Sequence, residues 1–143
     1  MAQVNKSVLV AQPAARMFEL VDDVERYVKF LPWCGGSECN YRDDKTTRAT
    51  LHIDYRGIKQ SFSTENAKTP PTLMQLKLVS GPFRSLEGHW RFTDLNGRGC
   101  KVELSLQYEF SSRLLEKLVG PVFGYIANTM VDAFVKRAQA LYG

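Results

Sequence analysis

The residue types that most often carry chemistry are few in this chain of 143 residues. It has two histidines, His52 and His89, and three cysteines, Cys34, Cys39 and Cys100. Both histidines fall at outward positions of predicted strands. The two histidines and three cysteines are not spaced along the chain as the ligands of a metal site usually are. No buried pair of acids with shifted pKa values is indicated either. The sequence therefore predicts a protein that is not an enzyme and that holds no metal.

The three cysteines are expected to be free thiols. Their number is odd, Cys34 and Cys39 lack the close pairing of a zinc knuckle, and Cys100 opens a strand as a small apolar residue. Free thiols are typical of a reducing compartment. The first ten residues, MAQVNKSVLV, have the pattern of a strand, and no apolar run approaches the ~20 residues that span a bilayer. We therefore expect a cytoplasmic protein.

The chemistry that the sequence favours is the binding of an apolar molecule. Two sets of large apolar side chains recur with the periods of strands and of a helix, so that each set shares one face. The strands contribute Phe62, Met74, Leu76, Leu78, Trp90, Phe92, Leu104, Leu106 and Tyr108, and the last helix contributes Phe123, Ile126, Met130 and Phe134. If these faces enclose a cavity, it suits an isoprenoid or acyl chain. The alternative is an ordinary filled core, because such residues are commonly buried.

A few polar and aromatic residues accompany these faces. Tyr108, Tyr125, Gln60 and the indole N–H of Trp90 are the candidates for orienting the head group of a ligand. Phe30, Trp33 and Phe83 are predicted to lie in loops, where they either form the mouth of a cavity or cover the ends of the sheet.

The elements that must position these residues follow from the periodicity. A strand at 4–10 precedes two helices, at 14–21 and 24–31, and a loop at 32–36. Strict alternation then marks strands at 49–55, 58–64, 73–79, 86–92 and 100–110. A long helix, capped by Ser111 or Ser112, ends the chain. We expect one α+β domain, residues 1–143, with one strand, two helices, about six antiparallel strands and a final helix on the concave face of the sheet.

The final helix carries Gly120, Pro121 and Gly124, which are costly in a helix interior. The helix proper begins either near Pro121, with residues 114–119 as a separate turn, or earlier, and in both cases the Gly-Pro step makes a joint there. We favour a joint that lets the end of the helix move and admit a ligand.

Three segments resemble one family. They are YVKFLPWC at 27–34, VSGPFRSLEGHWRF at 79–92 and FVKRAQALY at 134–142, and they are similar to the RatA and coenzyme Q-binding proteins of the START-like superfamily. The family usually has Tyr-Pro where this chain has Tyr27-Val28, a change that concerns local stiffness. The resemblance implies the helix-grip fold, in which a curved antiparallel sheet surrounds a long C-terminal helix. It transfers no catalytic residues.

The resemblance implies two functions. The first is non-catalytic binding of an isoprenoid quinone or a similar lipid between sheet and helix, in support of respiration and without a cofactor. The second is that of a ribosome association toxin, which binds the large ribosomal subunit and blocks subunit joining.

The charge is compatible with the second function. Net charge is +4 and the pI is about 9.0, with 19 Lys and Arg scattered along the chain. This is either an ordinary surface or one that attracts RNA or, transiently, an anionic membrane; DNA is not an expected partner. Candidate contacts to ribosomal RNA are Arg26, Lys29, Arg56, Lys59, Arg84 and Arg113.

Overall fold

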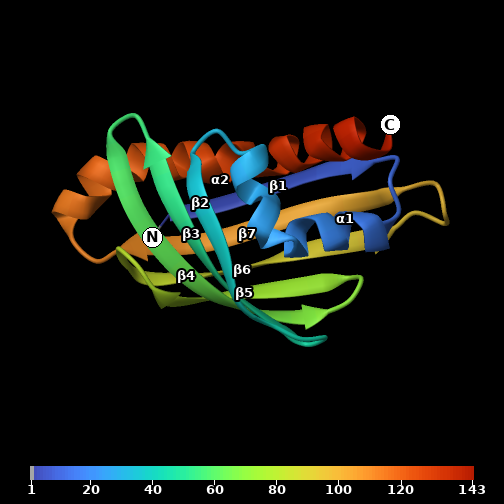
Figure 1. The fold of residues 1–143 in the computed structure, drawn as a ribbon, viewed down its shortest axis with the longest axis horizontal. Coiled ribbons are helices and arrows are strands. Elements are labelled where there is room, and N and C mark those ends of the chain that lie inside the picture. The colour runs from blue at the N-terminus through green and yellow to red at the C-terminus, as the bar shows by residue number, and fades with distance from the viewer. Residues whose placement is uncertain (1) are drawn as a thin grey trace.

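The computed structural model describes residues 2–143 and confirms the expected α+β architecture. The elements are β1 (Ala2–Val10), α1 (Ala14–Asp22), the 3-10 helix η1 (Val24–Lys29), β2 (Cys34–Arg42), β3 (Thr46–Tyr55), β4 (Ile58–Thr69), β5 (Leu73–Ser80), β6 (Phe83–Asp94), β7 (Cys100–Phe110) and α2 (Arg113–Tyr142). All seven strands form one antiparallel sheet in the order β1-β7-β6-β5-β4-β3-β2. The sheet is strongly twisted, so β2, β3 and β4 cross the view steeply while α2 runs along β1 and β7 (Figure 1).

The alternation in β7 divides its two faces as predicted. Its burial alternates strictly along eleven residues, and the buried set is Cys100, Val102, Leu104, Leu106, Tyr108 and Phe110. β7 pairs with β1 on one side and β6 on the other, which places it near the centre of the core against α2. Its period-2 pattern therefore fixes which face of the sheet receives the helix.

Several element boundaries differ from the sequence prediction, most clearly those of η1 and β2. The second helix is a short 3-10 helix that stops at Lys29, and β2 begins at Cys34, so the predicted loop at 32–36 is wrong in its second half. The backbone N–H of Asp54 donates to the carbonyl of Trp33 at 2.9 Å, and Cys34 pairs with Ile53. Pairing with β3 thus overrides the weak strand preference of the two glycines that follow Cys34.

Gly88 allows β6 to approach β7 closely. A Cβ at this position would lie 2.0 Å from the backbone oxygen of Ser105, which no side chain can occupy. Gly88 pairs with Leu106 in the middle of the two strands. A glycine in a strand interior commonly marks such a close backbone approach.

α2 is a single helix of 30 residues with Pro121 in its interior. The Ser112 side chain caps it by accepting a hydrogen bond from the backbone N–H of Leu115 at 3.1 Å. The alternative in which the helix begins near Pro121 is therefore wrong. Because proline has no N–H, it cannot donate to the carbonyl of Lys117, which leaves a weak point in the helix.

Packing does not require glycine on either side of that weak point. A Cβ at Gly124 would meet nothing within 4 Å, and one at Gly120 would make an ordinary contact of 3.8 Å with the ring of Phe110. Close packing therefore does not explain why glycine stands at these two positions, whereas a flexible joint in the helix would explain it.

By length and composition alone, α2 would be able to cross a membrane. The core helix of a soluble domain meets the same criterion, and Phe123, Ile126, Ala127, Val131 and Phe134 of α2 are buried against the protein. We interpret α2 as the core helix of this fold.

Candidate ligand cavity

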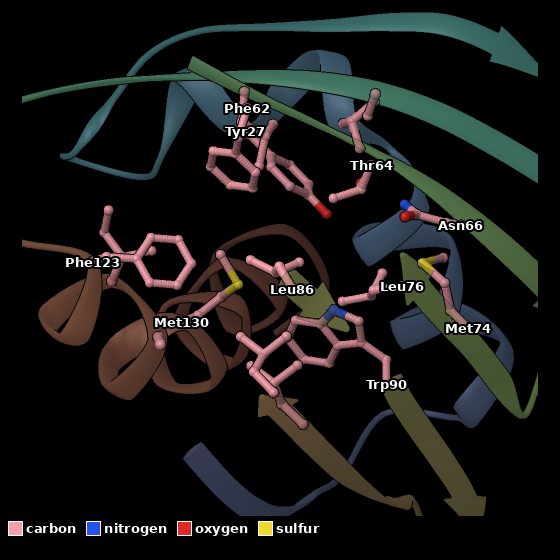
Figure 2. A pocket seen from close by; sticks show the side chains of 17 residues that line it. Tyr27, Phe62, Thr64, Asn66, Met74, Leu76, Leu86, Trp90, Phe123 and Met130 are labelled. Carbon is pink, nitrogen blue, oxygen red and sulfur yellow. The ribbon is translucent and has the colours of Figure 1, made fainter. Parts of the chain in front are cut away.

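A small cavity lies between the concave face of the sheet and α2, with a volume of about 60 Å³. Figure 2 shows side chains from η1, β4, β5, β6 and α2 pointing into it. Most of the wall is apolar, and its polar atoms come from a few residues. An apolar enclosure with a few polar groups is the usual form of a small-molecule site.

Nine of the predicted ligand-binding residues are brought together around this cavity. They are Phe62, Met74, Leu76, Trp90, Leu104, Leu106, Phe123, Ile126 and Met130. They come from four strands and α2, so only the folded chain unites them. Whether they bind a ligand remains a prediction.

Two predicted residues at one end of the core lie in a packed aromatic cluster. The ring centroids of Phe83 and Phe123 are 4.9 Å apart, and those of Tyr108 and Phe123 are 4.7 Å apart. Phe62 and Phe110 complete the cluster. Phe83 and Tyr108 therefore fill this end of the core and do not line the cavity.

At the other end, Phe134 and Phe92 are equally enclosed. Phe134 packs edge-on against Tyr27 at 5.2 Å and Trp90 at 5.4 Å, and Phe92 is fully buried beside Trp90. Both rings are enclosed by core side chains, and neither lines the cavity. Leu78, near the end of β5, does not reach it.

Phe30 and Trp33 lie away from the cavity, on a shallow depression outside α2. Trp33 is 1% exposed and belongs to the core, whereas the Phe30 ring contacts Phe134 at 5.2 Å. The prediction that these residues form a cavity mouth is therefore wrong, and the alternative that they cover the end of the sheet fits their packing.

Eight lining residues were not predicted as site residues: Val24, Tyr27, Ala49, Leu51, Thr64, Asn66, Leu86 and Ala127. Ala49, Leu51 and Leu86 take part in the apolar alternation of the predicted strands 49–55 and 86–92, so a stricter use of that pattern finds them. Asn66 was not predicted as a site residue, because the predicted strand ended at residue 64, whereas β4 continues to Thr69.

The polar groups around the cavity are mostly different from the predicted ones. Among the four candidates only Trp90 lines it, and Tyr125 stacks instead on Tyr55, with ring centroids 5.4 Å apart, at a partly exposed site. The structure places Tyr27 and Asn66 there (Figure 2). The Tyr27 hydroxyl donates to the carbonyl of Val21, and burial raises the pKa of this phenol far above its usual range.

The size of the cavity limits what it holds without rearrangement. A volume of 60 Å³ accommodates a few water molecules, whereas a cavity of about 150 Å³ is needed for a benzene ring. Leu51, Leu76 and Met130 line the cavity and are only partly buried. Methionine adapts its shape readily, so enlargement is expected to begin with Met130.

Known proteins resemble this chain over its whole length. The profile of the family described as polyketide cyclase / dehydrase and lipid transport matches residues 10–135. The ribosome association toxin RatA of Vibrio cholerae is 43% identical over 143 residues, which cover all of this chain and 99% of that protein. The mitochondrial coenzyme Q-binding protein COQ10 homolog B of Xenopus laevis is 31% identical over 132 residues, 90% of this chain and 54% of that protein.

The chain belongs to the polyketide cyclase/dehydrase and lipid transport family, and its curved sheet around a long helix is the START-like, helix-grip fold of that family. Within it, the chain is a member of the group that contains the RatA and coenzyme Q-binding proteins.

Enzymes share this fold. The crystal structure of the Zhui aromatase/cyclase from Streptomyces sp. R1128 matches with a TM-score of 0.79 at 18% identity and covers 96% of this chain and 93% of that one. At this identity the match concerns the fold alone. Within residues 2–143, no three His, Cys, Asp or Glu side chains are grouped so that they could hold a metal ion.

Proposed function

We propose that this protein binds an apolar ligand of the isoprenoid quinone class between its sheet and α2. The observation that carries the proposal is the cavity itself, whose wall is apolar on both the sheet and the helix side. The similarity to a coenzyme Q-binding protein over 90% of this chain supports the ligand class. The binding is proposed to be non-catalytic, to need no cofactor and to take place in the cytoplasm.

The test begins with native mass spectrometry of the protein purified from a host that makes quinones, followed by organic extraction. We expect an adduct with the mass of an isoprenoid quinone. A protein that stays free of ligand after quinone is added contradicts the proposal.

Substitutions of Met130 test the proposed ligand binding most directly. A charge in the cavity wall opposes an apolar ligand, because burying an unpaired charge is costly. Met130→Lys is expected to abolish the adduct, whereas Met130→Leu keeps it. Met130 is only partly buried, so the lysine variant is expected to fold, and circular dichroism checks this.

The second candidate function is association with the large ribosomal subunit. It is favoured by the 43% identity with a ribosome association toxin along the entire chain. Four of the predicted RNA contacts, Lys29, Arg56, Lys59 and Arg113, are exposed and form no ion pair with any residue in 2–143. Arg26 and Arg84 are less available, because they lie 2.7 Å from Asp23 and 3.5 Å from Glu109.

Cosedimentation with purified large subunits tests this function. Binding through phosphates weakens steeply as salt rises, so we expect less protein in the pellet at physiological than at low salt. The double variant Arg56→Ala/Lys59→Ala is expected to bind less. The matched control Arg48→Ala/Lys101→Ala removes two cations that are already paired with Glu65 and Glu103. Equal losses in both variants contradict a local contact at the β3–β4 turn.

A further inference from the structure

Asn66 is the polar residue in the cavity that the packing of the protein leaves unexplained. It lies on β4, is 5% exposed and lines the cavity. Its carbonyl oxygen Oδ1 is buried and accepts no hydrogen bond from any of residues 2–143. A buried acceptor without a partner lowers stability, and such an atom in a native protein calls for an explanation.

The surroundings of Asn66 point to a ligand. Figure 2 shows its amide, the Tyr27 hydroxyl and the Trp90 indole nitrogen directed toward the same space from β4, η1 and β6. The wall near them also includes Thr64, which forms no hydrogen bond with Asn66 Oδ1, and the apolar residues Leu76, Leu86 and Met74. The partner that this geometry provides for is a molecule that enters the cavity, either water or the polar group of a ligand that takes its place.

The available hydrogen-bonding groups define the chemistry of that partner. The Tyr27 proton is engaged by the Val21 carbonyl, so the Tyr27 oxygen offers only lone pairs to the cavity. Asn66 Oδ1 also accepts only, while the Asn66 NH₂ and the Trp90 N–H donate. A ligand carbonyl would satisfy a donor and leave Asn66 Oδ1 unpaired, whereas a ligand hydroxyl donates to Oδ1 and accepts from a neighbouring N–H.

We propose that Asn66 makes this cavity selective for a ring that carries a hydroxyl group, a phenol or a hydroquinone, over the corresponding quinone or ether. The inference rests on the proposed cavity function and adds to it the oxidation state of the ligand that is held. Since a quinone has no O–H, its reduced form is expected to bind more tightly.

The test uses two probes of similar size, 4-propylphenol and 4-propylanisole, with binding followed by calorimetry. The wild-type protein is expected to bind the phenol roughly tenfold more tightly than the ether, the effect of one hydrogen bond to a buried group that otherwise lacks a partner. Asn66→Leu, a change to a side chain of similar size, is expected to remove this preference. Asn40→Leu, at an exposed asparagine of β2, is expected to keep it.

The outcomes separate this inference from the proposed function. If neither probe binds the wild-type protein, the cavity does not take apolar rings and the proposed function fails. If both probes bind with equal affinity, or if Asn66→Leu retains the preference, selection by Asn66 is overturned.

Unfolding of the free protein provides a second readout. Asn66→Leu is expected to unfold at the same or a higher urea concentration, because it removes an unpaired buried acceptor. A clear loss of stability means that the amide has a structural partner, and this also overturns the inference.

Discussion

The Lys68 ammonium lies 3.0 Å from the Asp22 carboxylate and ties β4 to the end of α1 across 46 residues of sequence. The Lys68 side chain is 5% exposed and that of Asp22 is 16% exposed. The Thr47 hydroxyl donates to the other carboxylate oxygen at 2.7 Å, so both oxygens of Asp22 are paired. This buried pair fixes the end of α1 against β3 and β4, which are interior strands of the sheet.

Removing one member of this pair is expected to be costly. Asp22→Asn leaves the Lys68 charge buried without a counter-ion, and we expect a loss of about 3–5 kcal/mol in urea unfolding. Adding Lys68→Met to Asp22→Asn is expected to restore part of that loss. The exposed pair of Lys101 and Glu103 serves as the control, since Glu103→Gln is expected to change the free energy of unfolding by less than about 1 kcal/mol. A similar small effect for Asp22→Asn would show that this pair is not effectively buried.

The pair of Glu25 and Arg42 is expected to make stability depend on pH in the acid range. The Arg42 guanidinium donates two hydrogen bonds to the Glu25 carboxylate, at 2.7 and 2.9 Å, and lowers the pKa of Glu25 from 4.5 to about 2. A lowered pKa stabilises the folded state fully above the unfolded value of 4.5, and this contribution is lost as pH falls toward 2. Because the Glu25 side chain is 46% exposed, we expect no more than about 1 kcal/mol.

The variant Glu25→Gln tests the direction of this pH dependence of stability. The difference in unfolding free energy between the wild type and Glu25→Gln is expected to shrink as the pH is lowered from about 7 to 3. Glu87→Gln, at an exposed acid with no ion pair among residues 2–143, is expected to show no such trend. A difference in unfolding free energy that grows as the pH falls would contradict a lowered pKa of Glu25 in the folded protein.

Gly124→Ala is expected to stabilise the protein and to slow the entry of a ligand. There is open space for the added methyl group, and alanine is favoured over glycine in a helix by about 1 kcal/mol. If the segment around Pro121 is a joint, a stiffer helix opens less often, so the rate of probe binding in stopped-flow fluorescence falls. Gln139→Ala, exposed near the end of α2, is the control and is expected to leave this rate unchanged. An unchanged rate in Gly124→Ala removes the joint hypothesis.

Gly88→Ala is expected to have the opposite effect on stability. The added Cβ would collide with the Ser105 carbonyl, and the backbones of β6 and β7 would have to separate. Overpacking of this kind costs about 1–3 kcal/mol, and we expect the loss at the upper end because backbone must move. Thermal unfolding measures it, and a Tm equal to that of the wild type would show that the sheet adjusts freely.

The sequence was sufficient for the architecture because strands and helices leave different periods in it. The strict alternation from Cys100 to Phe110 defined β7 and its inner face, whereas the start of α2 was left open between a cap at Ser111 or Ser112 and a beginning near Pro121. It was insufficient where pairing decides the conformation. β2 begins at Cys34 because β3 lies beside it, and nothing in PWCGG carries that information.

The inward faces were also determined by the sequence, but the division between filled core and cavity was not. Leu104 and Tyr108 have the same periodicity, yet the first lines the cavity and the second packs among aromatic rings. Periodicity records the direction of a side chain, whereas a cavity depends on how far apart the twisted sheet and α2 lie at that point. For the same reason only the tertiary structure showed that Asn66 is buried without a partner, opposite Tyr27 and Trp90 from other elements of the chain.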